Sequence, residues 1–133
     1  MSPYSSVELA AMLRRAADGL LTTSAAVDLL IGHRVWLTRG DFARYVEVET
    51  DPRYAGDTPM ALVRWKAAVT AVKAGRLVCT SSEAAMLRVA ASIAEGLPVD
   101  LRDAVGGLDA RNIALVLEAL ATANGRRMVV TTR

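Results

Sequence analysis

The sequence predicts a mainly α-helical domain of about five to seven helices with two or three short strands, and a mixed α+β domain is the alternative. Three observations support this prediction. Apolar residues recur every three or four positions along most of the chain, residues typical of helix N-caps precede these stretches, and glycines follow them. The length of 133 residues and mass of 14.2 kDa fit one globular domain, residues 1–133. Hydrophobic residues make up 53% of the chain but aromatic residues only 5%, so we expect a core built mostly of alanine, leucine and valine.

Two helices are predicted at the N-terminus. Ser5 or Ser6 can cap the first, which reaches about Asp18 and turns leucines and alanines to one face. A threonine or serine within residues 22–24 can cap the second helix, and Gly32 stands where a left-handed residue would end it. A short apolar strand, residues 35–37, is expected next.

The stretch of residues 38–50 has two interpretations. Thr38 and Asp41 have the spacing of a capping box, and Leu37 with Phe42 could form its hydrophobic staple, which predicts a helix to about Val48. Alternatively, residues 39–41 form a turn that joins strands 35–38 and 45–50 into a hairpin. We favour the helix because apolar and polar residues separate with a period near 3.6.

A long helix is predicted after an irregular loop at residues 51–57. Thr58 is its expected cap and Pro59 its first residue, and Gly75 ends it after about Ala74. Trp65 is expected to anchor its buried face. The other residues assigned to that face are Leu62, Val69 and Val72.

The C-terminal half is predicted to hold three more helices. Thr80 and Glu83 form a capping box for a helix that ends near Gly96, and Asp100 caps a short helix that Gly106 stops. Asp109 caps the last helix. Its expected core residues are Ile113, Val116, Leu117 and Leu120. Residues 77–79 and 128–131 are predicted to be short strands.

Several classes of protein are disfavoured by composition. Arginine or aspartate interrupts every apolar run well before the roughly 20 residues that a membrane span needs, so we expect no membrane association. Met1–Glu8 lacks the basic and apolar regions of a secretory signal, which predicts a cytoplasmic protein. Cys79 is the only cysteine, which agrees with a reducing compartment.

Candidate catalytic and cofactor sites are scarce. His33 is the only histidine and Cys79 the only cysteine, so neither a metal cluster nor a catalytic dyad is expected, and no glycine-rich phosphate loop is present. The nearest carboxylate pairs, Glu47 with Glu49 and Asp100 with Asp103, fall at surface or capping positions. We therefore predict a protein that is not an enzyme and has no cofactor. The alternative is a small-molecule-binding protein or an enzyme whose site residues form no recognisable sequence motif.

Two kinds of macromolecular partner are considered. The net charge of +2 is spread along the chain rather than clustered, which supports nucleic-acid binding only weakly. The first two helices could form a helix-turn-helix, but residues 24–31 carry no Arg, Lys, Asn or Gln to read bases. His33, Arg34 and Arg39 would then be the contacts to nucleic acid.

A protein interface is the favoured hypothesis. Leu115 lies off the predicted core face of the last helix, between Arg111 and Glu118, so these three residues are candidates for contact with a partner. The partner at this interface could be a second copy of the chain, which would give a homodimer. We predict a small intracellular binding or regulatory protein that acts through a protein–protein interface.

Overall fold

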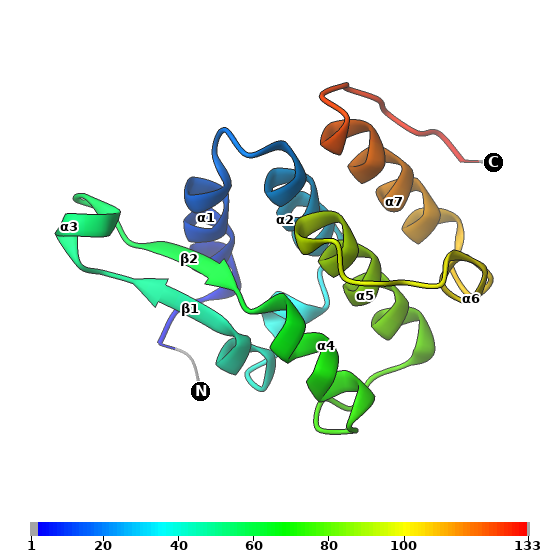
Figure 1. Cartoon of the computed structure of the whole chain (residues 1–133), viewed down its shortest axis with the longest axis horizontal. Helices are drawn as coiled ribbons and strands as arrows, with labels where there is room; N and C mark the ends of the chain where they lie inside the picture. The colour runs from blue at the N-terminus through cyan, green and yellow to red at the C-terminus, as the bar shows by residue number, and fades with distance from the viewer. Residues whose placement is uncertain (1–2, 133) are drawn as a thin grey trace.

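The computed structural model describes residues 3–132, and the prediction of a mainly helical fold is confirmed there. This part of the chain contains seven α-helices, two 3₁₀ helices and one two-stranded sheet. The sheet extends from one side of the molecule, whereas the helices form the body (Figure 1).

The first two helices match the prediction except at the ends of the second. Helix α1 (Ser6–Ala17) begins with a capping box, in which Glu8 N donates to Ser5 Oγ over 3.1 Å and Ser5 N donates to Glu8 Oε1 over 2.9 Å. Helix α2 (Leu21–His33) starts before the predicted cap and continues through Gly32, and the left-handed residue is Arg34, with φ of 61°. Gly32 was therefore wrongly assigned as a helix end.

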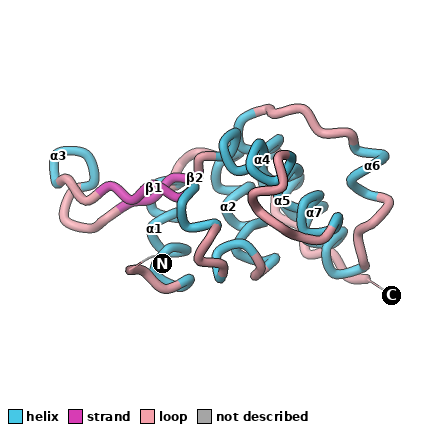
Figure 2. The backbone as a smooth tube through the Cα atoms, turned by 90° about the horizontal axis from the view of Figure 1, so that it is seen from below, coloured by secondary structure: helices cyan, strands magenta, loops and turns pink. Residues whose placement is uncertain are grey.

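Helix α2 lies at the centre of the helical body. It packs against α1, against α5 (Ser81–Glu95), against α7 (Ala110–Ala123) and against the first 3₁₀ helix (Figures 1 and 2). Its buried residues point in several directions, as expected of a helix covered on most sides. They are Ala25, Ala26, Val27, Leu29, Leu30 and His33.

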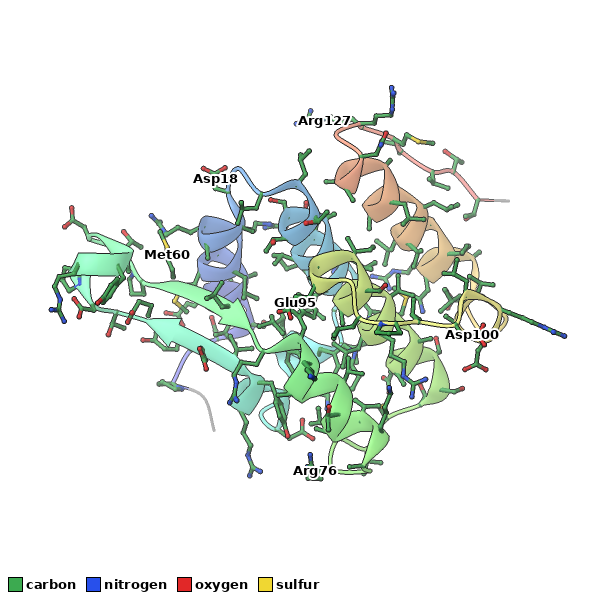
Figure 3. The ribbon with its side chains drawn as sticks, in the orientation of Figure 1. Asp18, Met60, Arg76, Glu95, Asp100 and Arg127 are labelled. Carbon is green, nitrogen blue, oxygen red and sulfur yellow. The ribbon has the colours of Figure 1, made fainter. Side chains whose placement is uncertain are left out.

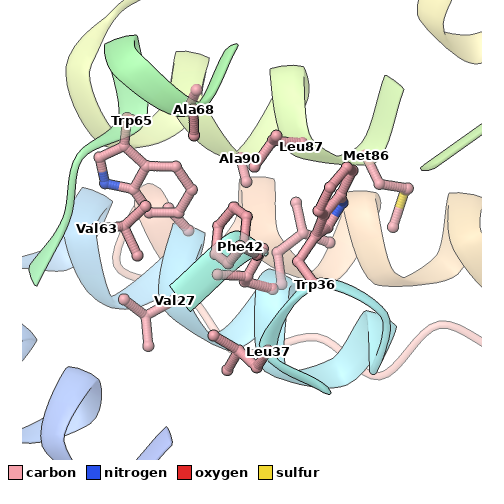
Figure 4. Close-up of a cluster of buried hydrophobic side chains, with 14 of the residues drawn as sticks. Val27, Trp36, Leu37, Phe42, Val63, Trp65, Ala68, Met86, Leu87 and Ala90 are labelled. Atoms are coloured by element: carbon pink, nitrogen blue, oxygen red, sulfur yellow. The ribbon is translucent and has the colours of Figure 1, made fainter. Parts of the chain in front are cut away.

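Residues 35–45 form neither the predicted strand nor the predicted helix. They form two 3₁₀ helices, η1 (Trp36–Thr38) and η2 (Phe42–Tyr45). In a strand, neighbouring side chains point to opposite faces, but Trp36 and Leu37 are both buried, which a tight turn permits. The Trp36 and Phe42 rings pack with centroids 5.4 Å apart, and Trp36 Nε1 donates to the Glu83 carbonyl over 3.2 Å (Figure 4).

A hairpin replaces the beginning of the predicted long helix. Strand β1 (Val46–Glu49) pairs antiparallel with β2 (Met60–Val63), and α3 (Pro52–Ala55) lies between them where an irregular loop was expected. The alternative prediction of a hairpin was wrong about one strand: it paired residues 45–50 with residues 35–38, but residues 35–38 are not part of the sheet. Along β2, Ala61 and Val63 are buried and Leu62 is 55% exposed, so the period is that of a strand and not of a helix.

The last three helices begin at their predicted caps, whereas the helix before them begins after Arg64 and not at the predicted cap Thr58. Helix α4 (Trp65–Lys73) is the second part of the predicted long helix, and Trp65 is buried at 4% exposure as expected. Helix α5 has the Thr80–Glu83 capping box, and Asp100 and Asp109 cap α6 (Leu101–Val105) and α7. The predicted strands at residues 77–79 and 128–131 are wrong, because both stretches lack ladder hydrogen bonds.

One apolar core joins the helices to the inner face of the hairpin. Residues from α2, η1, η2, β2, α4 and α5 meet in it (Figure 4). Its largest fully buried side chains are Trp36, Phe42, Leu13, Leu30, Met86 and Leu87. Alanines fill the spaces between helices, which allows α2 to approach its neighbours closely.

Candidate protein-binding surface

The three residues predicted as a protein interface on α7 make contacts within the chain. Arg111 Nη2 donates to the Gly32 carbonyl, and the Leu115 side chain lies over Gly32, 3.0 Å from the position that a Cβ there would occupy. Glu118 Oε1 accepts from Val130 N over 3.0 Å. These residues hold α7 against α2 and the C-terminal segment against α7.

The exposed side of α7 differs from the predicted one. Val116 is buried as expected. Leu117 and Leu120 were expected in the core but are 42% and 50% exposed. Leu115, which was expected off the core face, packs against Gly32 of α2. Gly32 explains the difference, since a residue without a side chain leaves room for Leu115 on α2.

The three residues predicted to contact nucleic acid lie in different environments. His33 is buried, and Arg34 is exposed at the end of α2. Arg39 forms a two-bonded ion pair with Asp41, with distances of 2.9 and 2.6 Å, and its guanidinium carbon lies 4.9 Å from the centre of the Trp36 ring. This hydrogen-bonded pair lowers the pKa of Asp41 and raises that of Arg39. The second helix of the suggested helix-turn-helix is the central core helix α2.

A buried polar junction surrounds His33, where the end of α2 meets the beginnings of α5 and α7. Burial lowers the pKa of the His33 imidazole, Arg111 lowers it further, and Glu83 and Asp109 act in the opposite direction. Asn112, which the sequence reasoning missed, is also buried and donates to Ser82 Oγ over 3.4 Å. Within the described residues, His33 Nδ1 and Asn112 Oδ1 have no hydrogen-bond partner.

Cys79 carries the chain's one thiol and is half-buried. Burial raises the pKa of the Cys79 thiol, which favours the less reactive protonated form. Residues 3–132 contain no group of three or more histidine, cysteine, aspartate or glutamate side chains placed to hold a metal ion. None of their helices has the length and apolar character needed to cross a membrane.

One small cavity lies beside α5 and α6. It has a volume of about 280 Å³, and its charged lining residues are Lys73, Arg88, Asp100 and Asp103. Arg88 Nε is buried without a hydrogen-bond partner in the described structure. Cations and carboxylates occur in equal number around the cavity, so its charge favours no class of ligand.

The hairpin offers the most distinctive exposed surface. We call residues 46–63 the hairpin arm, which comprises β1, α3 and β2 and projects away from the helical body (Figure 1). The register pairs Val46 with Val63 and Val48 with Ala61 on the face toward α1. The opposite face, which we call the outer face, carries Glu47, Glu49, Met60 and Leu62.

Apolar and acidic side chains alternate over this outer face. Leu62 is 55% exposed opposite Glu47, and Tyr54 of α3 is 69% exposed nearby. A groove of about 700 Å³ lies between the arm and Ala16 of α1, and its residues from the arm are Glu47, Val48, Glu49, Tyr54, Met60 and Leu62. Glu47 also lies 3.4 Å from Arg64, an ion pair in which both side chains are more than half exposed.

The outer edge of β1 is the second notable feature of the arm. In the two-stranded sheet, β1 pairs only with β2, so its other edge has no strand neighbour among the described residues. A second groove of about 660 Å³ lies beside Val46 and Val48, and its other lining residues are Pro3, Tyr4, Gly40, Asp41, Ala43 and Arg44. This groove provides space next to the backbone of β1.

Sequence reasoning did not find this surface. It noted Glu47 and Glu49 as exposed carboxylates, which is correct, but it placed Leu62 in the core of a helix. The alternation of Val46-Glu47-Val48-Glu49 was the available signal for β1, but residues 60–63 read Met-Ala-Leu-Val and are apolar throughout, so no matching alternation in the sequence indicated the partner strand.

Comparisons with known proteins give no match: no family model, no curated protein and no solved structure resembles this chain.

Proposed function

We propose that this chain is a binding protein whose hairpin arm takes an extended, basic and apolar segment of a protein partner as an added strand. The observation that carries the proposal is the edge of β1 that has no strand neighbour among residues 3–132, beside an outer face that combines two carboxylates with exposed apolar side chains. No catalytic group is required for this role.

The backbone of β1 supplies the first part of the argument. An edge strand presents N–H and C=O groups that an extended peptide can pair with, and natural proteins usually protect such edges. Here no strand of the described residues pairs with this edge, and a groove lined by Pro3, Tyr4 and Arg44, among others, lies beside it. Backbone pairing would give affinity without demanding one particular sequence.

The outer face supplies selectivity. Glu47 and Glu49 lie on the same face of β1, with Leu62 and Met60 opposite them on β2. A strand added to β1 would place alternate side chains beside the two glutamates, where cationic residues are favoured and anionic residues are repelled. Apolar residues of the partner could extend the contact toward Leu62 and Tyr54.

The same charges argue against nucleic acid at the arm. Phosphates would meet Glu47 and Glu49 at close range, and these carboxylates repel them. Arginines are also paired with carboxylates: Arg53 with Asp51 on the arm, and Arg39 with Asp41 and Arg14 with Asp28 outside it. These pairs lower the positive charge that the arginines would otherwise present to a nucleic acid.

Binding of defined peptides tests the proposal. Three eight-residue fluorescent peptides are titrated with the protein: one alternating arginine and valine, one alternating glutamate and valine, and the first with a central proline. We expect the basic peptide alone to bind, because glutamates are repelled and proline cannot complete the hydrogen-bonded ladder. Equal binding of all three peptides, or binding of none, would refute strand addition at the arm.

A pair of matched variants locates the binding site. Glu47→Lys/Glu49→Lys should weaken binding of the basic peptide at least about tenfold, since two attractions become repulsions. Glu95→Lys/Asp103→Lys changes the net charge equally at exposed positions outside the arm and should leave the affinity nearly unchanged. Equal weakening in both variants would show that the peptide responds only to overall charge.

A further inference from the structure

We infer that the segment bound by the arm is residues 126–132 of a second copy of this chain, so that the protein pairs with itself by exchanging C-terminal segments. This inference rests on the proposed function and names the partner of the same surface. We call residues 126–132 the tail segment.

The tail segment is extended but belongs to no sheet. Met128 and Val129 are 57% and 91% exposed, and Val129 is the most exposed of the large hydrophobic residues described. Residues 128–132 read Met-Val-Val-Thr-Thr, a composition typical of strands, and the sequence alone predicted a strand at 128–131. The segment thus has the features of a strand whose neighbour lies outside its own chain.

Few bonds hold the tail segment in its place. Arg126 N donates to the Ala121 carbonyl and Arg126 Nε to Asn124, both close in sequence. Beyond residue 126, the one hydrogen bond recorded in the described structure runs from Val130 N to Glu118 Oε1 over 3.0 Å. Most of the backbone donors and acceptors in this segment are therefore free to pair in a ladder.

The charges of the two surfaces are complementary. The tail segment carries Arg126 and Arg127, both exposed, and the outer face of the arm carries Glu47 and Glu49. Successive residues of a strand point to opposite faces, so either orientation of the tail places one of its two arginines on the face with the glutamates. Val129 and Val130 then point to opposite faces, one to the face that carries Val46 and Val48 and the other to the face that carries Met60 and Leu62.

Within one chain, the tail segment lies too far from the arm to pair with β1 (Figures 1 and 2). The hairpin arm and the tail segment lie on opposite sides of the molecule (Figures 1 and 2), and the labels of Met60 and Arg127 in Figure 3 mark this separation. A second copy is the simplest source of the missing strand. Reciprocal exchange uses both arms and both tails and closes a twofold dimer.

Charge reversal tests the exchange. The mass of the protein is followed by sedimentation over a range of about 1 to 200 µM, which spans dissociation constants typical of modest interfaces. We expect the wild-type mass to rise from that of one chain to that of two. Arg126→Glu/Arg127→Glu and Glu47→Arg/Glu49→Arg should each shift the dissociation constant upward by at least about tenfold, because like charges then face each other.

Mixing the two reversed variants provides the decisive measurement. In the mixture, the reversed arm of one variant faces the reversed tail of the other, so we expect a one-to-one heterodimer at concentrations where each variant alone is a monomer. A structural defect in either variant would not be repaired by mixing. The control Arg76→Glu/Arg102→Glu alters two exposed arginines outside both surfaces and should dimerise like the wild type.

The outcomes separate the inference from the proposed function. A wild-type chain that stays monomeric while its arm binds the basic peptide would overturn the exchange and leave the arm as a site for another protein. A dimer that survives both charge reversals would also overturn it, because the interface would lie elsewhere. Absence of both dimer and peptide binding would refute both.

Discussion

His33 is a buried ionisable residue whose pKa is shifted by its surroundings. Its ring is 5% exposed at the polar junction, between the C-terminal end of α2 and the N-terminal ends of α5 and α7. Burial is the largest influence that lowers the pKa of the imidazole, Arg111 lowers it further, and Glu83 and Asp109 oppose this shift. The neutral imidazole is therefore the form that this site accommodates.

We predict that His33 makes stability depend on pH between about 7.5 and 5.5. Its folded pKa is lower than its unfolded value, so the unfolded state binds more protons as the pH falls through that unfolded value. Acidification should then reduce the free energy of unfolding until the folded pKa is reached. Urea unfolding at both pH values should show a larger loss for the wild type than for His33→Gln. Equal losses in the two proteins would show that His33 is not responsible.

Gly32 shows how one small residue sets the packing of two helices. A Cβ at this position would lie 3.0 Å from Leu115 Cδ2, which is closer than side chains normally pack. Gly32→Val should therefore lower the free energy of unfolding by about 1–3 kcal/mol through overpacking.

A double mutant tests this contact between α2 and α7. Gly32→Val combined with Leu115→Ala should cost less than the sum of the two single changes, because the shortened side chain makes room for the valine. Gly40→Val is the matched control, since a Cβ at Gly40 would meet no atom within 4 Å. Strict additivity in chemical denaturation would contradict the contact.

At the scale of the elements, side-chain hydrogen bonds at the N-terminus fix where most helices begin. At α5, Glu83 N donates to Thr80 Oγ1 over 3.1 Å and Thr80 N donates to Glu83 Oε1 over 2.9 Å. Asp100 and Asp109 cap α6 and α7 through one bond each. Thr58 shows the opposite case, because it has a capping residue type but precedes strand β2.

We predict that Thr80→Ala lowers the free energy of unfolding by about 1 kcal/mol, since the first turn of α5 loses the acceptor for one of its amides. Thr80→Ser keeps the hydroxyl and should lose much less. Thr58→Ala removes a threonine that caps no helix and should change stability by less than about 0.5 kcal/mol. Thermal or urea unfolding compares the three variants. A larger effect at residue 58 than at residue 80 would reverse this assignment of the caps.

At the scale of the whole molecule, the chain consists of a helical body centred on α2 and a hairpin arm that touches it on one face. Helix α2 is covered by α1, α5 and α7, whereas β1 has a free edge and α3 is largely exposed. Local opening is easiest where few buried contacts must break. The arm should therefore open far more often than α2.

We expect hydrogen exchange to separate the two parts. Amides of α2 should exchange at least about a hundredfold more slowly than those of β1 in dilute protein, because they open only with the core. Raising the protein concentration should slow exchange in β1 and in the tail segment if a second copy pairs with the arm. Uniform protection of β1 and α2 in dilute solution would contradict this division.

Local signals in the sequence were sufficient for a large part of the fold. The cap at Ser5 or Ser6, the capping box at Thr80, the caps at Asp100 and Asp109, and the glycine after α5 were all placed correctly, and the structure adds that Ser5 is the cap and forms a capping box with Glu8. A cap is a hydrogen bond between residues two or three apart, so the information that specifies it lies within one turn of the chain. The mainly helical class follows from the sum of these signals.

Tertiary structure decided the remaining features, and the candidate site is among them. Thr58 and Pro59 have the local character of a helix start, yet residues 60–63 form a strand because Val46–Glu49 is available to pair and α1 covers Ala61 and Val63. Likewise Leu115 faces the core because Gly32, distant in sequence, makes room for it on α2. Such choices depend on the energy of contacts between distant segments, which no local pattern contains. The acidic and apolar outer face of the arm exists only because of that pairing, so the sequence by itself determined its residues but not their common surface.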